Sequence, residues 1–575
     1  MHKLRTVIPA IIACLLVAAA AYLWTSRLMD SLTAYRSPLH ATPPAPGQPT
    51  GSPATRRVVM VLVDALREDT SLRADVMPFL NELRGRGAWA TMASRPPSYS
   101  EAGYTTLFTG AWPDISDGPT LNADYAQIPA WTQDDLFSAA RRAGLRTAVS
   151  GYYWFEKLIP QASVDASFYT PGEDRAADRA VVDAALPWLR AGDAQVALIH
   201  LDQVDWAGHH EGGPRDPRWD LAARRADDLL REIAATLDLS RDTLLVVSDH
   251  GQIDRGGHGG QDPVVLREPF VLAGAGVRPG RYGDVQMVDV APTAAALLGA
   301  SIPASSQGRV RTEMLELPPG RETAIRDSLR DQQARLAAAY TAAIGREAAV
   351  APSEDPVSST QAGMAAARAA RLSAERLPRA LIALILAVLP AIALYRLRGR
   401  AVAWLIGGAL AYVALFNLCY VALAGWGYSL SSVTSEADLL LTVGGCALLA
   451  LLIAWIGVAL GLGIFRRSGE GRRQRIAPTD GEPRRIGPSG GLRRAAEITL
   501  ALALVIVYLL ALPFLLSYAV NGLLVTWTLP DFAIVFAGFL SALQALFVAI
   551  GGLLLAGVAA GVAWAIGRGH GAAPA

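Results

Sequence analysis

Residues 58–64 read Val-Val-Met-Val-Leu-Val-Asp, an unbroken apolar and largely β-branched run that ends on a carboxylate. A run of this length without polar alternation is typical of a strand buried on both faces, as in a parallel sheet. The following chain alternates between strand-like and helix-like segments, with strands predicted at residues 147–150, 195–201, 243–247 and 269–273 and helices at 133–143 and 219–237. We therefore predict an α/β domain with a mostly parallel sheet flanked by helices.

Three aspartates, Asp64, Asp205 and Asp249, closely follow predicted strands. Ligands of parallel sheets bind beyond the carboxyl ends of the strands, so we expect all three to face one crevice. Histidines accompany the last two aspartates, because five of the eight histidines of the chain fall within residues 200–258. Carboxylates and neutral imidazoles are the ligands that borderline divalent cations prefer, and zinc is the commonest of these in proteins. The sequence thus indicates a metal site.

A nucleophile candidate lies in residues 96–110, which read Pro-Pro-Ser-Tyr-Ser-Glu-Ala-Gly-Tyr-Thr-Thr-Leu-Phe-Thr-Gly. A hydroxyl at the start of a helix can lose its proton beside a metal and meet a phosphate that the helix dipole favours. Taken alone, the stretch is equally typical of a Ser/Thr-rich helix cap. Ser100 is the preferred nucleophile, and Ser98 is the alternative.

The order of these residues resembles the signature of the alkaline phosphatase superfamily, in particular its type I phosphodiesterase and nucleotide pyrophosphatase group. Within that group the chain is most similar to the glycosylphosphatidylinositol (GPI) ethanolamine phosphate transferases. The resemblance covers roughly residues 56–310 and is carried by Asp64-Ala-Leu-Arg-Glu-Asp69, Met77-Pro-Phe-Leu80, residues 96–110, Asp205-x-x-Gly-His209 and Ser248-Asp-His-Gly251. It implies an alkaline-phosphatase-like fold in the soluble part.

The resemblance also implies two divalent cations, Zn²⁺ or alternatively Mn²⁺. One cation would be held by Asp205, His209 and His258, and the other by Asp64, Asp249, His250 and Ser100. Ser100 would attack phosphorus to form a phosphoseryl enzyme, which water or an acceptor hydroxyl would then cleave.

Several positions depart from the family pattern. The nucleophile of the resembling enzymes is usually Thr, and Glu101-Ala-Gly103 replaces an apolar residue and Pro. Tyr152 and Tyr153 stand where the family has paired acids, and this aromatic stretch is either core packing or a substrate wall. A sulfatase is excluded, because Ser100 lacks the Pro and Arg of a formylglycine motif. The glycines at residues 256–260 are expected to bend the chain so that His258 reaches the metals.

The chain is also a membrane protein by composition, with 52% hydrophobic residues. Residues 7–24 form an apolar run preceded by Lys3 and Arg5, which we interpret as an uncleaved anchor, with a cleaved signal peptide as the alternative. Five further spans are predicted from the apolar runs at residues 380–395, 401–425, 439–465, 498–520 and 532–566. The last run is long enough to be one tilted helix or two helices.

Loop charges predict the orientation of these spans. Residues 396–400 and 466–494 are rich in arginine, whereas the connections near Glu436 and Asp531 are acidic. A cytoplasmic amino terminus places both basic loops in the cytoplasm and the catalytic domain outside. Arg371, Arg376 and Arg379 would then lie on the outer side, where they would contact anionic lipid head groups. All three cysteines fall in apolar runs, so the soluble part has no disulfide.

The predicted organisation is an anchor (residues 1–30), a Pro-rich linker (31–55), a catalytic domain (56–350), a linker (351–376) and a membrane domain of about five helices (377–567). We expect a multi-pass enzyme of the cytoplasmic membrane that transfers phosphoethanolamine or a similar phospho-alcohol to a lipid or glycolipid. A phosphodiesterase or phosphatase that uses water is the alternative enzyme, and a non-catalytic scaffold is a third reading. The expected partners are a phospholipid or phosphodiester substrate and the membrane, without nucleic acid.

Overall fold

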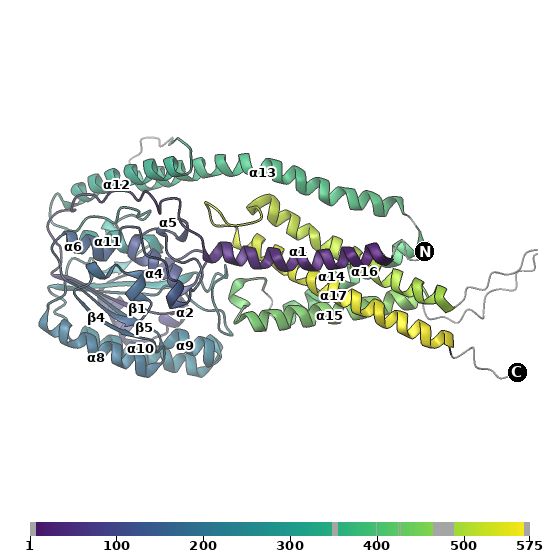
Figure 1. The fold of residues 1–575 in the computed structure, drawn as a ribbon. Helices are drawn as coiled ribbons and strands as arrows, with labels where there is room; N and C mark the ends of the chain where they lie inside the picture. The colour runs from purple at the N-terminus through teal and green to yellow at the C-terminus, as the bar shows by residue number, and fades with distance from the viewer. Residues whose placement is uncertain are drawn as a thin grey trace, which may run out of the picture.

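The computed structural model describes residues 7–347, 355–397, 399–423, 425, 427–463 and 488–568. An α/β domain occupies one end of the molecule and a bundle of long helices the other (Figure 1). The predicted fold class is confirmed: a mostly parallel sheet is flanked by helices, with an amino-terminal apolar helix and a carboxy-terminal helical bundle.

The sheet has the strand order β4-β3-β5-β1-β6-β7-β2-β8, and β9 pairs with β2. Its strands are β1 (Arg57–Val63), β2 (Ala88–Ala93), β3 (Thr147–Tyr152), β4 (Ala166–Thr170), β5 (Val196–Leu201), β6 (Asp242–Val247), β7 (Arg267–Gly274), β8 (Gly280–Arg281) and β9 (Val285–Gln286). Only β7 runs antiparallel to its neighbours among these strands. All five predicted strands are present, and β1 lies between β5 and β6, with Val61 opposite Ile199 and Val246.

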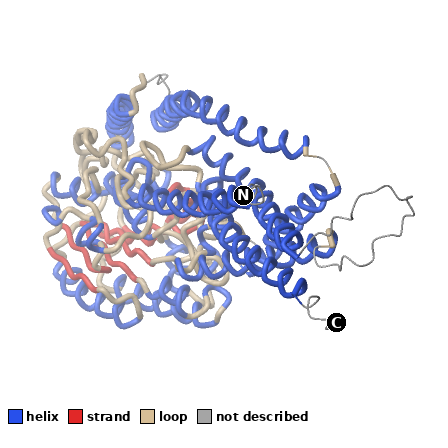
Figure 2. Tube along the Cα trace, turned by 45° about the vertical axis from the view of Figure 1, so that its right-hand side comes forward, coloured by secondary structure: helices blue, strands red, loops and turns tan. Residues whose placement is uncertain are grey.

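Helices cover both faces of the sheet (Figures 1 and 2). Val58, Met60 and Leu62 of β1 point into one core, and the alternate residues Val59, Val61 and Val63 point into the other. Both alternating sets of side chains in residues 58–63 are therefore buried, which explains why the run lacks polar alternation. The covering helices are α3 (Pro78–Arg86), α8 (Arg175–Ala191) and α10 (Pro217–Ala234) on one face, and α4 (Ser100–Thr109), α6 (Leu136–Arg142) and α11 (Val290–Leu298) on the other.

The two segments expected to be linkers are more ordered than the sequence suggested. In the first, Leu39 is fully buried, the Ser37 amide donates to Asp117 Oδ1 (2.9 Å), and Thr50 Oγ1 donates to the Ala300 carbonyl (3.0 Å). This Pro-rich segment is thus packed against the α/β domain rather than flexible. The second expected linker, residues 351–376, is helical from Pro356 onward, because α13 (Pro356–Arg396) runs through it into the membrane domain. The domain boundaries themselves stay a prediction.

Among the described residues, six helices are long and apolar enough to cross a membrane. They are α1 (Val7–Thr33), α13, α14 (Arg400–Leu423), α15 (Glu436–Gly461), α16 (Pro488–Asn521) and α17 (Phe532–Arg568). Residues 532–566 therefore form one continuous helix. The α1 helix packs against both α16 and α17, and its amino-terminal end lies far from the sheet (Figure 1).

The α14–α15 connection of the bundle contacts the α/β domain. Arg255 donates to the carbonyls of Leu423 (2.8 Å) and Ser432 (3.1 Å), and the Gly260 amide donates to Ser431 Oγ (3.0 Å). At the α16–α17 connection, the outer arginines bind protein groups. Arg371 stacks on Trp527 and pairs with Glu375, Arg379 also pairs with Glu375, and Arg376 Nε donates to the Val520 carbonyl. These contacts join α13 to the α16–α17 connection.

Candidate functional site

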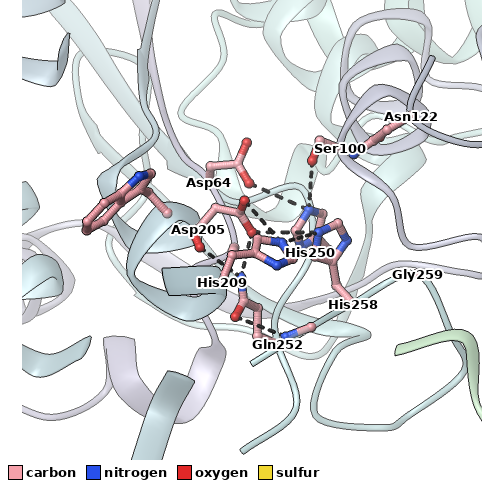
Figure 3. Close-up of polar contacts among 12 residues, drawn as sticks. Asp64, Ser100, Asn122, Asp205, His209, His250, Gln252, His258 and Gly259 are labelled. Carbon is pink, nitrogen blue, oxygen red and sulfur yellow. Dashed lines mark hydrogen bonds and ion pairs between the residues drawn. The ribbon is translucent and has the colours of Figure 1, made fainter. Parts of the chain in front are cut away.

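The carboxyl ends of β1 and β6 carry the most deeply buried part of the site, which we call the closed half: Asp64, Asp249 and His250. Their side chains are at most 1% exposed. His250 Nε2 lies 3.5 Å from Asp64 Oδ1 and 3.3 Å from Asp249 Oδ2. The Asp249 Oδ1 atom accepts a hydrogen bond from the Ala65 amide at 3.2 Å. Ligand atoms of Asp64, Asp249 and His250 lie within 4.8 Å of one another. Figure 3 shows Asp64 pointing toward His250.

Asp205, His209 and His258 form the second group, which we call the open half. Asp205 and His209 lie one turn apart on α9 (Gln203–His210), with 3.5 Å between Asp205 Oδ2 and His209 Nε2. The Nε2 atoms of His209 and His258 face each other at 3.0 Å. The His209 side chain is 31% exposed, whereas that of His250 is fully buried. The open half is therefore accessible to a substrate.

The glycine-rich loop brings His258 to this position. Gly256, Gly257 and Gly259 have φ values of +88°, +109° and +106°, a conformation that residues with a Cβ rarely adopt. The loop bends back, and His258 comes to lie against His250 with ring centroids 3.9 Å apart. The structure confirms the bend that the glycines predicted.

Ser100 is the first residue of α4, and its Oγ lies 3.1 Å from His250 Nε2 (Figure 3). The helix can approach this closely because of Gly103, where a Cβ would come within 2.7 Å of Asp249 Cβ. The alternative nucleophile, Ser98, is occupied elsewhere: its Oγ donates to the Gly260 carbonyl (2.9 Å) and accepts from the Gly259 amide (3.0 Å). Of the two serines, only Ser100 presents its hydroxyl to the cluster.

Hydrogen bonds orient both buried imidazoles as ligands. The Nδ1 atoms of His250 and His258 lie 3.1 and 3.0 Å from the carbonyls of Gly251 and Ser98. Because a carbonyl only accepts, each Nδ1 carries the hydrogen, and each Nε2 lone pair points into the site. Burial lowers the pKa of both imidazoles to about 4, so they are neutral at pH 7.

The structure adds residues that the sequence reading did not assign to the site. His200 Nε2 lies 3.0 Å from Asp64 Oδ2, and Tyr104 Oη donates to the same oxygen. Gln252 Nε2 donates to Asp205 Oδ1 at 2.6 Å. Asp202 directly follows β5 and reaches the same region, so its place after a strand was an available signal. His210, in contrast, stacks on Trp206 away from the cluster.

A cavity of about 380 Å³ opens above the cluster. The residues that line this cavity are mostly polar or aromatic: Asp64, Ser100, Tyr104, Asn122, Tyr152, Trp154, Glu173, Asp202, Asp205, His209, His210, His258 and Thr434. Tyr152 and Trp154 therefore line the site, whereas Tyr153 stacks on Tyr125 with ring centroids 4.8 Å apart. A larger apolar pocket of about 500 Å³ lies beside it among α1, α15 and α17, and Thr434 lines both spaces.

Comparisons with known proteins agree with this architecture. Residues 58–311 match the family model of type I phosphodiesterase / nucleotide pyrophosphatase. The catalytic subunit of GPI ethanolamine phosphate transferase 2 from Homo sapiens is 29% identical over 312 residues, which are 49% of this chain and 31% of the relative. GPI ethanolamine phosphate transferase 3, catalytic subunit, from Homo sapiens is 28% identical over 343 residues, or 52% of this chain and 31% of the relative.

The chain thus spans about a third of the length of these curated relatives (31%). Among solved structures, murine ectonucleotide pyrophosphatase / phosphodiesterase 5 aligns with a TM-score of 0.37 and 13% identity, covering 45% of this chain and all of that one. The resemblance predicted from the sequence motifs is confirmed, and residues 58–311 are the part of the chain that matches the type I phosphodiesterase and nucleotide pyrophosphatase family.

Proposed function

We propose that this protein is a membrane-anchored, divalent-metal-dependent phosphotransferase that cleaves a phosphodiester through a phosphoseryl intermediate on Ser100. The reaction is the transfer of phosphoethanolamine or a similar phospho-alcohol from a phospholipid to a lipid or glycolipid acceptor. One observation carries the proposal: the Ser100 hydroxyl lies at the start of α4, 3.1 Å from the buried Asp/His cluster, in a cavity that adjoins an apolar pocket of the membrane helices.

The residues of the cluster fit bound cations. Asp64 Oδ1 and Asp249 Oδ2 are buried and accept no hydrogen bond within the described part of the chain. Burial, followed by the Asp64 carboxylate, raises the pKa of Asp249 well above its usual range. Buried carboxylates without partners are costly, and a metal ion is a usual way in which proteins stabilise them. The Nε2 atoms of His209 and His258, 3.0 Å apart, can share a hydrogen bond, and both could instead bind one cation.

Asp64, Asp249, His250 and Ser100 would hold one cation, and Asp205, His209 and His258 the other. His250 belongs to both candidate groups, Asp64–Asp249–His250 and Asp205–His250–His258, which supports two neighbouring cation sites. When bound, such cations lower the pKa of a coordinated hydroxyl and stabilise charge on phosphoryl and alcohol oxygens. Zn²⁺ suits these nitrogen and oxygen ligands, and Mn²⁺ is the alternative.

The protein groups define the course of the reaction. The amino terminus of α4 presents backbone N–H groups and a positive dipole end to the phosphoryl group, while Ser100 Oγ attacks phosphorus. The bond from phosphorus to the donor alcohol breaks, and that alcohol departs on the side of the open half. An acceptor hydroxyl then enters on the same side, attacks phosphorus and releases Ser100. Exposure of His209 on that side leaves room for both alcohols.

The apolar pocket supports a lipid substrate. It is lined by Leu28 of α1, Leu439 of α15 and Phe536 of α17, and Tyr99, the neighbour of Ser100, reaches into it. A hydrocarbon chain bound among these helices would leave its head group at the catalytic cavity. Filling this space with Leu439→Trp should raise KM for a long-chain phosphodiester and leave a short water-soluble phosphodiester unaffected. Leu441→Trp, at a position 76% exposed on the same helix, is the matched control.

Membrane orientation follows from the same arrangement. The α14–α15 connection contacts the α/β domain, and Arg368 of α13 joins the α16–α17 connection to Asp114 of that domain. The carboxyl end of α13 and the start of α14 lie at the far end of the bundle (Figure 1). With basic loops in the cytoplasm, the catalytic domain is extracytoplasmic, and we propose the cytoplasmic membrane as the location. Cysteine accessibility labelling of intact cells at Ser358→Cys, in the exposed first turn of α13, tests this orientation.

The function is tested with purified full-length protein in detergent and labelled phosphatidylethanolamine. Transfer of label to an added glycolipid acceptor supports the proposal. Release of free phosphoethanolamine alone favours the alternative, a phosphodiesterase that uses water. Absence of both reactions in protein loaded with Zn²⁺ or Mn²⁺ would contradict phosphodiester chemistry at this site.

A further inference from the structure

A second cavity of about 380 Å³ lies between the α/β domain and the amino-terminal half of α13. Trp112 and Asp114 line it from the domain, at the start of α5 (Pro113–Ser116), and Tyr340 lines it from α12 (Arg321–Ala343). The α12 helix packs along α13 at the outside of the domain (Figure 1). This cavity and the catalytic cavity share none of their described lining residues, and the reaction proposed above does not use it.

Three arginine side chains give this cavity a positive charge. Arg95 lines it from the loop after β2, and Arg368 and Arg376 line it from α13. Asp114 is the only carboxylate among the described lining residues, and its Oδ2 already pairs with Arg368 Nη1 at 3.1 Å. Arg376 Nε donates to the carbonyl of Val520, which is a neutral group. The cavity therefore carries an excess of two positive charges.

Arg95 is held in place by an aromatic ring rather than by an anion. Its guanidinium lies over the Trp112 ring, with Cζ 4.3 Å from the ring centroid, and it forms no ion pair or hydrogen bond with a described residue. Stacking occupies the face of the guanidinium and leaves the N–H donors around its edge free to bind an anion. The Tyr340 hydroxyl, on a residue only 3% exposed, also lacks a hydrogen-bond partner in the described part of the chain.

The cavity lies where α13 changes from a polar to a lipid-facing helix. Within the described residues of α13, large apolar side chains become exposed from Leu377 onward, directly after Arg376. Leu377 is 66% exposed, Leu381 55% and Leu384 59%, and this part of α13 is apolar enough to cross a membrane. The arginines therefore lie at the level where lipid head groups begin, so a bound phosphate could remain attached to acyl chains that lie along α13.

We propose that Arg95, Arg368 and Arg376 bind the phosphate of an anionic phospholipid such as phosphatidylglycerol, at the membrane surface on the side of the α/β domain. Guanidinium groups bind phosphate oxygens in pairs, and the excess positive charge disfavours head groups that also carry an ammonium group. Of the arginines that the sequence predicted to contact lipid, Arg376 lines this cavity. The inference is independent of the proposed function, because no bond is made or broken at this site.

The test is photolabelling of the full-length protein in detergent with phosphatidylglycerol that carries a diazirine in its head group. Label should appear within residues 364–376, and Arg95→Gln should lower it on the order of 10-fold. Arg190→Gln, which changes an exposed arginine in the last turn of α8, is the matched control and should leave it unchanged. Residues 466–494 are arginine-rich and also attract anionic lipid. Label confined to them, or unchanged label on α13 in Arg95→Gln, would overturn the inference.

Asp114→Asn tests the charge argument in the opposite direction. The change frees Arg368 from its ion pair and should increase labelling of α13. A variant that only disturbed the fold would label less, so reduced labelling in Asp114→Asn would contradict a phosphate site.

Competition with unlabelled compounds identifies the ligand. Phosphatidylglycerol should suppress the label on α13, and phosphatidylcholine with the same acyl chains should require on the order of 10-fold more for the same suppression. Equal competition by the two lipids would overturn the preference for an anionic head group. Suppression by free glycerol 3-phosphate at the concentration at which phosphatidylglycerol acts would make the ligand a soluble phosphate ester and reject a lipid.

Discussion

The closed and open halves of the site use the same kinds of side chain in different surroundings. Asp249 and His250 of the closed half are fully buried, whereas Asp205 and His209 of the open half are 16% and 31% exposed. The closed half is positioned by the α/β domain alone, through β1, β6 and the start of α4. In the proposed reaction, burial of the closed half would fix Ser100 in position, and exposure of the open half would allow alcohols to exchange.

The open half also depends on the membrane domain. The loop that carries His258 is joined to the α14–α15 connection, where the Gly260 amide donates to Ser431 Oγ and Gln261 Nε2 donates to the Tyr428 carbonyl. The apolar helices therefore help to position the open half. In the proposed reaction, the chemistry on Ser100 and the exchange of alcohols would take place on different sides of one cavity.

The largest effect is expected for Ser100→Ala. Without the Oγ nucleophile, phosphodiester cleavage should fall by on the order of 10³-fold or more. Steady-state kinetics on a soluble phosphodiester measures this loss. Ser98→Ala is the matched control, because among the described residues the Ser98 hydroxyl bonds to backbone groups of Gly259 and Gly260 and not to the Asp/His cluster. Equal losses in the two variants would contradict the assignment of the nucleophile.

A pair of variants compares the two halves directly. Asp249→Asn removes a buried ligand and should lower kcat on the order of 10³-fold, because charge stabilisation by a metal is worth several kcal/mol. His209→Ala should cost only about 10- to 100-fold, and added zinc should restore part of the activity. Kinetics with metal analysis checks both. A larger loss in His209→Ala than in Asp249→Asn would reverse the proposed roles of the halves.

A smaller effect is expected for Ser431→Ala. The change removes the hydrogen bond to the Gly260 amide and loosens the loop of His258, so activity should fall less than about 10-fold. The loss should appear with lipid and soluble substrates alike. Ser517→Ala in α16, whose hydroxyl has no hydrogen-bond partner among the described residues, serves as the control. An unchanged rate in Ser431→Ala would contradict a role of the membrane domain in positioning the open half.

The smallest effect is expected for Glu101→Gln, next to the closed half, and concerns the stability of the fold. Burial raises the pKa of Glu101 to about 8, from an ordinary value of about 4.5 for a glutamate in the unfolded chain. Between these values the unfolded state loses its proton while the folded state keeps it, so the Glu101 side chain destabilises the fold increasingly as pH rises. Glu101→Gln should therefore raise Tm relative to wild type at pH 8 and have no effect at pH 4. Thermal unfolding in detergent at the two pH values measures this, and a Tm difference that shrinks with rising pH would contradict it.

Much of the fold was predictable because its central strands are continuously apolar. The residues of β1 and β6 are buried on both faces and therefore read as continuous apolar runs. β2 and β4 escaped prediction because Ala88–Ala93 is half-exposed with three alanines and Ala166–Thr170 lies at the sheet edge. The expected linkers were misread because burial of Leu39 and extension of α13 from Pro356 are tertiary effects that local composition does not report.

The site was predictable where its residues follow strands or belong to motifs, as Asp64, Asp249 and His258 do. Residues that act through space were not predictable. Tyr104 and His200 reach Asp64 from α4 and β5, and no sequence spacing connects them. Asp202 follows Leu201 of β5 directly, so the rule that selected Asp64 applied to it as well.

The central claim, a covalent intermediate on Ser100, is tested most directly by trapping it. Wild-type protein is mixed with a phosphodiester substrate, quenched with acid within one turnover, digested and sequenced by mass spectrometry. The account predicts a phospho-alcohol ester on Ser100, present in wild type and absent from Ser100→Ala. An ester on Ser98, or substrate turnover with inversion of configuration at phosphorus and no adduct, would contradict it.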